Sequence, residues 1–593
     1  AFRSIVSEFT ADSRGGVILI TLRRRRDGGM DGNLQFSTVQ SNRIAGYTPT
    51  GRIGIRTGRW TLTASGSGSF TPVAQSRFTE TRGQAGQPLP FAGRSDSKSR
   101  TNYGRGHFSA VFDPTPKHTA GFDIEYTERS THMPTLSRTT LGQTQSDSRY
   151  RQHMGGNTLT ATANYIWKID TLGSQFKLIA DYTRYTAHGD NSYHTTTCAP
   201  GTLRDSLYES ATGSVYDILT ADAGLTRKLP HGLTLRAGLR YTRNGMADDS
   251  RYAAQMQGTW QALPEYGYDQ HYTEQIGAAY ASLEYSAGRW ELSAGLRGEY
   301  TSVASQAFGR SYFGLFPNVS VSRALNALRT WLLVAQWSRN IERPAFPALN
   351  PARIRISDYS WQSGNPSLRP TYIHRFSLTA VWKYRYTLTV GGNLHHDLIR
   401  EIAHRDATAP DAVYIRPENH YTENHWFVAA SVPAKITRWW NLSVNAVGVM
   451  QRIRLNSTDS PATHYLMFAD ATCSFTLPAG FFAEAVYRAQ SRLYSGNSEV
   501  GPRHTLSATV KKQLFGKRLT LFCTLSNITG CDWEFASLTD GMRRTIDTGQ
   551  AWSGRLWKVG AAWNFRTGKK FRARTVESAA ETQRKRLVKS TEQ

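Results

Sequence analysis

The sequence has few cysteines, a low hydropathy and no long apolar run. Its 593 residues include four cysteines, which are too few and too scattered for a disulfide framework or a zinc site. No stretch approaches the about 18 consecutive apolar residues of a transmembrane helix, and the mean hydropathy is −0.48. Aromatic residues nevertheless make up 11% of the chain. This content excludes a disordered chain, because disordered segments are poor in aromatics.

Catalytic motifs are also missing. The sequence contains no Gly-x-Ser-x-Gly nucleophile elbow, no phosphate-binding loop and no Cys-x-x-Cys pair. His395 and His396 are adjacent on an expected strand, so their side chains point to opposite faces and cannot chelate one ion together. We therefore expect no enzymatic activity, no catalytic residue, no bound cofactor and no metal site.

Apolar and polar residues alternate with period two through much of the chain. In RWELSAGLRGEY (289–300), one face carries Trp290, Leu292, Ala294, Leu296 and Tyr300, and the other carries Glu291, Ser293, Gly295, Arg297 and Glu299. Residues 232–242 and 385–394 repeat this pattern, which indicates β-strands. Two architectures share it: a soluble sandwich, whose apolar face is the core, and a membrane barrel, whose apolar face meets lipid.

The lengths of the connections favour the membrane barrel. Short turns alternate with long polar stretches, namely 81–100, 129–149, 188–211, 244–271, 341–369 and 528–554. Short turns at one rim and long loops at the other are typical of outer-membrane barrels. We therefore predict an all-β fold, an antiparallel transmembrane β-barrel of about 22 strands with long extracellular loops and short periplasmic turns. A barrel of this size is wide enough to need a plug.

The last expected strand has the form of an assembly signal. In RLWKVGAAWNF (555–565), Trp557, Trp563 and Phe565 lie on one face. A final amphipathic strand that ends on Trp-x-Phe resembles the terminal signal read by the outer-membrane barrel assembly machinery, so this machinery is an expected partner.

Three segments resemble the TonB-dependent receptors of the Gram-negative outer membrane. In GNPSLRPTY (364–372), Asn365, Pro366, Leu368 and Pro370 match the family's Asn-Pro-x-Leu-Lys-Pro-Glu motif, with Arg369 in place of Lys and Thr371 in place of Glu. Residues 525–533 resemble a strand end of these receptors, and RGGVILITLRRRR (14–26) resembles the last strand of their plug. The match is to the subfamily labelled outer membrane β-barrel family protein.

The resemblance implies three parts. Residues 1–30 would be the C-terminal remnant of a plug that is otherwise lacking, 31–565 the transmembrane barrel, and 566–593 a basic, solvated periplasmic tail. The TonB complex would be a partner only if a complete plug and a TonB box exist upstream. The expected location is the outer membrane of a Gram-negative bacterium, with membrane lipid and lipopolysaccharide as neighbours and a surface lipoprotein as a candidate partner.

The charge balance is compatible with this assignment. The net charge is +26, of which residues 1–30 carry +3 and residues 566–593 carry +6, which leaves +17 on the barrel. Such a barrel favours anions such as lipopolysaccharide phosphates or an anionic substrate, and we expect no nucleic-acid partner.

The resemblance implies uptake of a scarce nutrient, which binds in the outer loops and the lumen. The nutrient would be a ferric siderophore or another metal complex, a glycan or a peptide. Aromatic residues of the expected outer loops are candidate ligand contacts: Trp260, Tyr266, Tyr268, Tyr359 and Trp361. The alternative is a non-transporting surface barrel, such as an adhesin, a phage receptor or a truncated receptor product.

Overall fold

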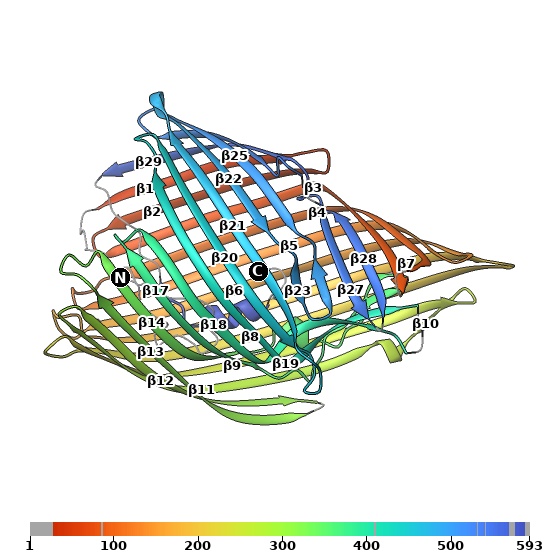
Figure 1. Ribbon diagram of the computed structural model, residues 1–593, viewed down its shortest axis with the longest axis horizontal. Helices are drawn as coiled ribbons and strands as arrows, with labels where there is room; N and C mark the ends of the chain where they lie inside the picture. Colours follow the sequence, from red (N-terminus) through yellow and green to blue (C-terminus); the bar gives the residue numbers. More distant parts are fainter. Residues whose placement is uncertain are drawn as a thin grey trace.

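The wall of the molecule is one closed antiparallel sheet. The computed structural model describes residues 28–84, 87–306, 308–407, 409, 411–530, 532–539, 541–568 and 576–587. Twenty-two strands form the barrel, and strands account for 78% of the chain. Strand β1 pairs with β2 on one side and with β29 on the other, and this pairing closes the barrel (Figure 1). The predicted fold class is confirmed.

The strands of the wall follow one another in sequence order. They are β1 (Gly29–Gln40), β2 (Ile44–Thr57), β3 (Trp60–Gln84), β4 (Gln87–Phe112), β5 (His118–Leu141), β6 (Thr144–Lys168), β7 (Gln175–Ala199), β8 (Thr202–Lys228), β9 (Leu233–Met256), β11 (Tyr268–Ala287), β12 (Trp290–Ser305), β13 (Gly309–Ala324), β14 (Trp331–Glu342), β17 (Thr371–Trp382), β18 (Tyr386–Arg405), β19 (Val413–Lys435), β20 (Trp440–Arg454), β21 (Ala462–Thr476), β22 (Phe481–Gln490), β25 (Arg503–Leu514), β26 (Leu519–Ser526) and β29 (Leu556–Gly568).

Shorter elements lie in the connections and after the last strand. They are β10 (Thr259–Ala262), β15 (Ile354–Ser357), β16 (Ser360–Gln362), β23 (Leu493–Ser495), β24 (Ser498–Val500), β27 (Trp533–Thr539), β28 (Met542–Gly549), the α-helical turns α1 (Phe346–Leu349) and α2 (Glu581–Arg584), and the 3-10 turns Pro264–Tyr266, Pro478–Gly480 and Lys585–Leu587. No helix in the described part of the chain is long and apolar enough to cross a membrane.

The wall is apolar outside and polar inside. On β12, Leu296 and Tyr300 are 49% and 55% exposed, whereas Arg297 and Glu299 between them are each 2% exposed. Strand β9 repeats this, with exposed Leu239 and buried Thr242. A soluble sandwich would bury the apolar face instead. The barrel orientation of the alternating pattern is therefore confirmed, because the apolar side chains point away from the interior.

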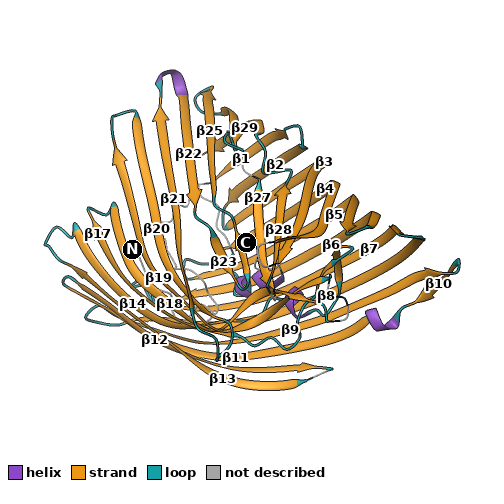
Figure 2. Ribbon diagram, turned by 45° about the vertical axis from the view of Figure 1, so that its right-hand side comes forward, coloured by secondary structure: helices purple, strands orange, loops and turns teal. Residues whose placement is uncertain are grey.

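Four of the six stretches that we expected to be long loops are strands. Strands β3 to β9 contain 24–27 residues each (Figure 2), and tight turns join β5 to β6 and β7 to β8. A span of about 9–11 residues crosses the membrane, so more than half of each strand rises beyond it (Figure 1). The rising parts meet no lipid on either face. They therefore lack the apolar alternation that identified the other strands.

The last connection completes the wall above the membrane. In this connection β27 pairs with β28, and β28 pairs with the outer half of β3 from Met542–Gln84 to Gly549–Arg77. Because β27 pairs with β24, this hairpin continues the sheet outward between β24 and β3.

The terminal strand β29 closes the barrel with the aromatic residues predicted for it. Trp557 and Trp563 are 53% and 39% exposed on the lipid side. The Phe565 ring covers Gly32 of β1, where an added Cβ would lie 2.2 Å from the Phe565 Cζ atom. A side chain at position 32 would therefore force the Phe565 ring to move. The strand continues three residues past Phe565, to Gly568, which pairs with Gly29 of β1.

The ends of the chain differ from the expected division. Of the predicted plug remnant, residues 1–27 lie outside the part of the chain that the structure describes. Strand β1 begins at Gly29, within the range that was assigned to the remnant. Residues 576–587 do not form a solvated tail: they lie inside the barrel, where Figure 1 shows their dark blue helical turn, and Arg586 is 6% exposed. Basic composition did not predict this, because each basic side chain was assumed to be solvated.

Candidate ligand-binding site

The connection between β14 and β17 folds into the barrel. Residues 343–370 carry α1, β15 and β16, and both Phe346 and Leu349 of α1 are 1% exposed. Together with Leu368, which is fully buried, they pack against Tyr216 and Tyr272 of the inner wall. Each of these burials stabilises the inward position by about 1.5–3 kcal/mol. We call residues 343–370 the inward loop.

Charged side chains fix the start of the inward loop. Arg343 Nη2 donates to Glu299 Oε2 (2.8 Å) and lies close to Glu274 of the neighbouring strand. All three side chains are at most 2% exposed. Removal of one partner from such a buried group would destabilise the fold, because the remaining charge would have no compensating charge.

The motif matched by sequence forms the returning limb of the inward loop. Asn365 Nδ2 donates to the Pro417 carbonyl (3.0 Å), and Arg369 pairs with Asp397 (2.7 Å). Leu368 is the limb's buried anchor, and its carbonyl accepts from Arg310 (2.6 Å). Pro366 and Pro370 bracket this limb in sequence. The motif thus holds the inward loop in place.

A row of tyrosines faces the middle of the inward loop. Tyr150, Tyr193 and Tyr208 are directly paired across β6, β7 and β8. The Arg355 guanidinium carbon lies 6.0, 5.9 and 5.8 Å from their three ring centroids. These distances are within the range of cation–π attraction. Tyr150 and Tyr193 are buried, at 5% and 6% exposed, so the three rings and Arg355 form one packed cluster on the inner wall.

Asp358 fixes Arg355 against the row. Its carboxylate accepts from Tyr150 Oη (2.8 Å), from Ser148 Oγ and from Arg355 Nη2 (2.7 Å). Burial raises the pKa of the Tyr150 phenol, and the Asp358 charge raises it further. Tyr150 therefore stays protonated and acts as a hydrogen-bond donor. We call Tyr150, Tyr193, Tyr208, Arg355 and Asp358 the tyrosine–arginine site.

The tip of the inward loop is tied to the opposite wall. The Tyr359 carbonyl accepts from Arg82 (3.3 Å), and Ser360 Oγ accepts from Arg544 (3.0 Å). Both arginines pair with Glu80 at 2.8 Å. Burial alone would raise the pKa of Glu80, but Arg544 and Arg82 outweigh it and lower that pKa. The loop therefore spans the outer part of the lumen between two walls.

The aromatic residues predicted as ligand contacts fall into separate groups. Tyr359 packs edge-to-face on Phe91 at 5.7 Å, and Trp361 pairs in register with Tyr414 on β19. Tyr266 lies 5.7 Å from the Arg353 guanidinium carbon, near Tyr268 in sequence, and Trp260 is 43% exposed on β10. The structure does not bring the five together, and their role in binding stays a prediction.

Sequence reasoning missed the tyrosine–arginine site. Its three tyrosines lie on stretches that were interpreted as loops or on their borders, and 43 residues separate Tyr150 from Tyr193 in sequence. Residues 193–197 (YHTTT) show no alternation of apolar and polar side chains, so the sequence carried no periodic signal there. Only the strand register places the three rings side by side.

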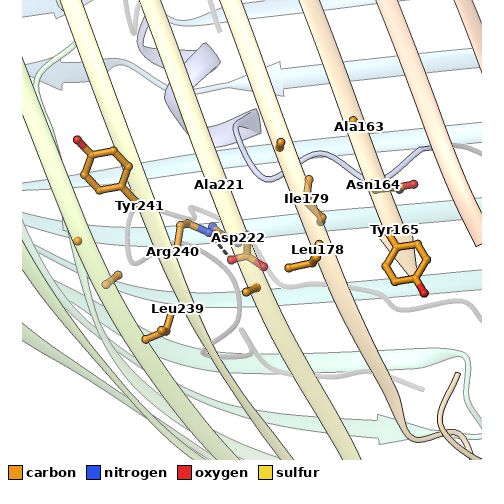
Figure 3. Close-up of a pocket in the computed structure, with 14 residues that line it drawn as sticks. Ala163, Asn164, Tyr165, Leu178, Ile179, Ala221, Asp222, Leu239, Arg240 and Tyr241 are labelled. Carbon is orange, nitrogen blue, oxygen red and sulfur yellow. Dashed lines mark hydrogen bonds and ion pairs between the residues drawn. The ribbon is translucent and has the colours of Figure 1, made fainter. Parts of the chain in front are cut away.

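A further recess lies on the other side of the wall. A furrow of about 720 Å³ crosses β6 to β9 between exposed Leu178 and Leu239 (Figure 3). The ion pair of Asp222 and Arg240 (2.7 Å) lies on the lumen face of the same strands. Because its rims are apolar and point outward, the furrow belongs to the lipid-facing surface and not to the candidate site.

The closed 22-stranded barrel, its apolar exterior and its long outer extensions define an outer-membrane β-barrel protein. Residues 167–560 match the family model described as outer membrane protein beta-barrel family, and the chain belongs to that family. It is therefore a protein of the Gram-negative outer membrane.

Solved structures of outer-membrane receptors share the fold. The siderophore receptor PirA from Pseudomonas aeruginosa is 12% identical with a TM-score of 0.55, over 92% of this chain and 81% of that chain. A mutant of the ferric enterobactin receptor PfeA from Pseudomonas aeruginosa is 13% identical (TM-score 0.57, 90% and 80%). The copper transporter OprC is 11% identical (TM-score 0.61, 92% and 81%). Among curated proteins, no sequence matches this chain.

Proposed function

We propose that this chain is the barrel of a TonB-dependent uptake receptor that captures a scarce nutrient in its outer lumen. The tyrosine–arginine site carries the proposal: it joins three cross-strand rings and a guanidinium on a loop that enters the barrel. Aromatic rings and a cation suit a flat or sugar-like ligand with negative charge. A ferric siderophore, another metal complex, a glycan and a peptide remain the candidate nutrients, and the chemistry is binding and passage without a covalent step.

Several partners belong to the same proposal. Energised passage requires the TonB complex, a plug and a TonB box. The aromatic face of β29 supports recognition by the barrel assembly machinery. The long outer extensions provide a surface for lipopolysaccharide and for a surface lipoprotein.

A second function has a specific observation in its favour. The inward loop and residues 576–587 both occupy the lumen, and they share the contact of Arg586 with the Pro344 carbonyl. A barrel filled in this way suits a non-transporting surface protein, such as an adhesin or a phage receptor.

Binding and uptake by cells that carry the full chain in the outer membrane distinguish the two functions. Ferric enterobactin is the first probe, because similar structures carry that name, followed by other iron complexes, oligosaccharides and peptides. We expect Tyr193→Leu and Arg355→Gln each to weaken binding of the accepted probe by about tenfold. Tyr300→Leu is the matched control, because Tyr300 points to lipid. Binding without uptake would favour the surface-barrel alternative, and equal binding by all three variants would refute the site.

A further inference from the structure

Residues 576–587 dock on the inner wall through a series of specific contacts. The Ala579 amide donates to Asp181 Oδ2 (2.8 Å), and Asn244 Nδ2 donates to Gln583 Oε1 (3.2 Å). Lys177 pairs with Glu577 at 2.5 Å. These three wall residues belong to β7 and β9, so the segment lies across several strands of the barrel. Ala580 at its centre is fully buried.

Arg586 makes a buried contact with β11 and with the inward loop. Its Nη1 donates to Glu274 Oε2 (2.5 Å), and its Nε donates to the Pro344 carbonyl (3.0 Å). The guanidinium carbon lies 4.3 Å from the centre of the Phe346 ring. A carboxylate, a carbonyl and an aromatic face together satisfy a guanidinium in charge, hydrogen bonding and stacking.

Other features of the wall match the segment in shape. Gly121 leaves room for Val576: a Cβ added at Gly121 would lie 3.0 Å from Val576 Cγ2. Leu587 packs against the apolar cluster that holds the inward loop. The wall therefore contacts the backbone, one arginine and the small side chains of this segment.

We propose that the inner wall around Asp181, Asn244 and Glu274 is a peptide-binding site for an arginine-bearing segment, and that residues 576–587 are its tethered occupant. Seven residues, 569–575, separate the segment from β29. A short tether raises the local concentration to about the millimolar range, so that the chain's own segment outcompetes free peptides. Because Arg586 contacts the inward loop as well as the wall, occupancy of this site also holds the start of that loop. The site is independent of the nutrient that binds in the outer lumen.

Disulfide trapping in the full chain tests the docked position. In a background in which the four native cysteines are serine, Gly121→Cys with Val576→Cys brings two thiols within bonding reach. The positive control is Gly121→Cys with Asn164→Cys, because these residues are direct partners of β5 and β6. Mass spectrometry of the digested protein detects the linked peptides. We expect both pairs to link in outer-membrane vesicles, and a linked control without a linked test pair would overturn the proposal.

Matched charge variants test the role of the arginine. We expect Arg586→Gln to lower the yield of the 121–576 disulfide by about tenfold, since it leaves Glu274 without its closest partner. Lys585→Gln removes the same charge from a side chain that is 58% exposed, and its yield should equal that of the parent. Equal losses in both variants would show a nonspecific charge effect and would overturn the proposal.

Peptide binding tests the site itself. We expect a synthetic peptide of residues 576–587 to bind the full-length Arg586→Gln chain at least about tenfold more tightly than the same peptide with glutamine in place of its arginine at 586. Fluorescence anisotropy of the labelled peptides measures both affinities. Indistinguishable affinities, or no binding of either peptide, would refute an arginine-specific peptide site.

Discussion

Removal of the Leu368 side chain should release the inward loop. Leu368 is fully buried and belongs to one cluster with Phe346 and Leu349 of the loop and with Val303 of the wall. A buried leucine replaced by alanine costs about 2–5 kcal/mol through lost transfer energy and the remaining cavity. At about 1.4 kcal/mol per factor of ten, opening of the loop should become roughly 30 to 4,000 times more frequent.

Hydrogen–deuterium exchange of the barrel in detergent measures this opening. The amides of Gly364 and Asn365 report it, because they donate to carbonyls within the same loop at 2.9 and 2.7 Å. Their protection should fall by the calculated factor in Leu368→Ala, while the wall strands stay protected. Leu388→Ala is the control, because Leu388 is 49% exposed on the lipid face. Unchanged protection of both amides would refute the conclusion that this motif residue anchors the loop.

Three further predictions concern charge and closure. Burial raises the pKa of Asp248 to about 6. Between pH 4 and 6 the folded state therefore holds a proton that the unfolded state has released. The free energy of unfolding should fall by up to about 3 kcal/mol as the pH rises through this range. Asp248→Asn should abolish this pH dependence of the free energy of unfolding, measured by denaturant titration. An unchanged pH dependence would show that another group causes it. Glu80→Gln should cost about 3–5 kcal/mol, because it leaves two buried arginines unpaired, and proteolysis of the outer hairpins should become faster at neutral pH. The lowered pKa of Glu80 means that the parent keeps this stability at neutral pH and loses it on acidification, and a variant as resistant as the parent would contradict the assignment. Gly32→Val should prevent closure under the Phe565 ring, so the heat-modifiable folded band on gels should be lost, whereas retention of the band would show that β1 and β29 tolerate a side chain there.

The lipid-spanning part of the fold was accessible from sequence. On β12, the exposed Leu296 and the buried Arg297 lie on the faces that alternation predicted. This succeeds because each spanning residue meets either lipid or the lumen, and the two environments select opposite side chains. The same reasoning failed for the outer halves of β3 to β9. Both faces there are polar, and a strand with two polar faces has no periodic signature.

The candidate site was less accessible than the fold. Residues 365–370 were recognised as a motif. They anchor the inward loop because Leu368 packs into an apolar cluster that is formed by residues of strands distant in sequence. Tyr193 and Tyr208 become neighbours only through the register of β7 and β8. Arg355 reaches them because the loop turns inward, a direction that local composition does not encode.

The amino-acid sequence alone determined that the chain is an outer-membrane barrel of about 22 strands, which of its residues face lipid, and which strand closes it. These properties follow from local alternation, the aromatic end of β29 and the receptor-like motif at Asn365 to Pro370, and none of these signals needs knowledge of distant contacts. Tertiary structure decided how the lumen is filled. Arg586 lies against Glu274, 312 residues away, and the inward loop spans two walls. Such pairings depend on where the closed sheet brings its strands, because the closure of the barrel sets which distant residues meet inside it.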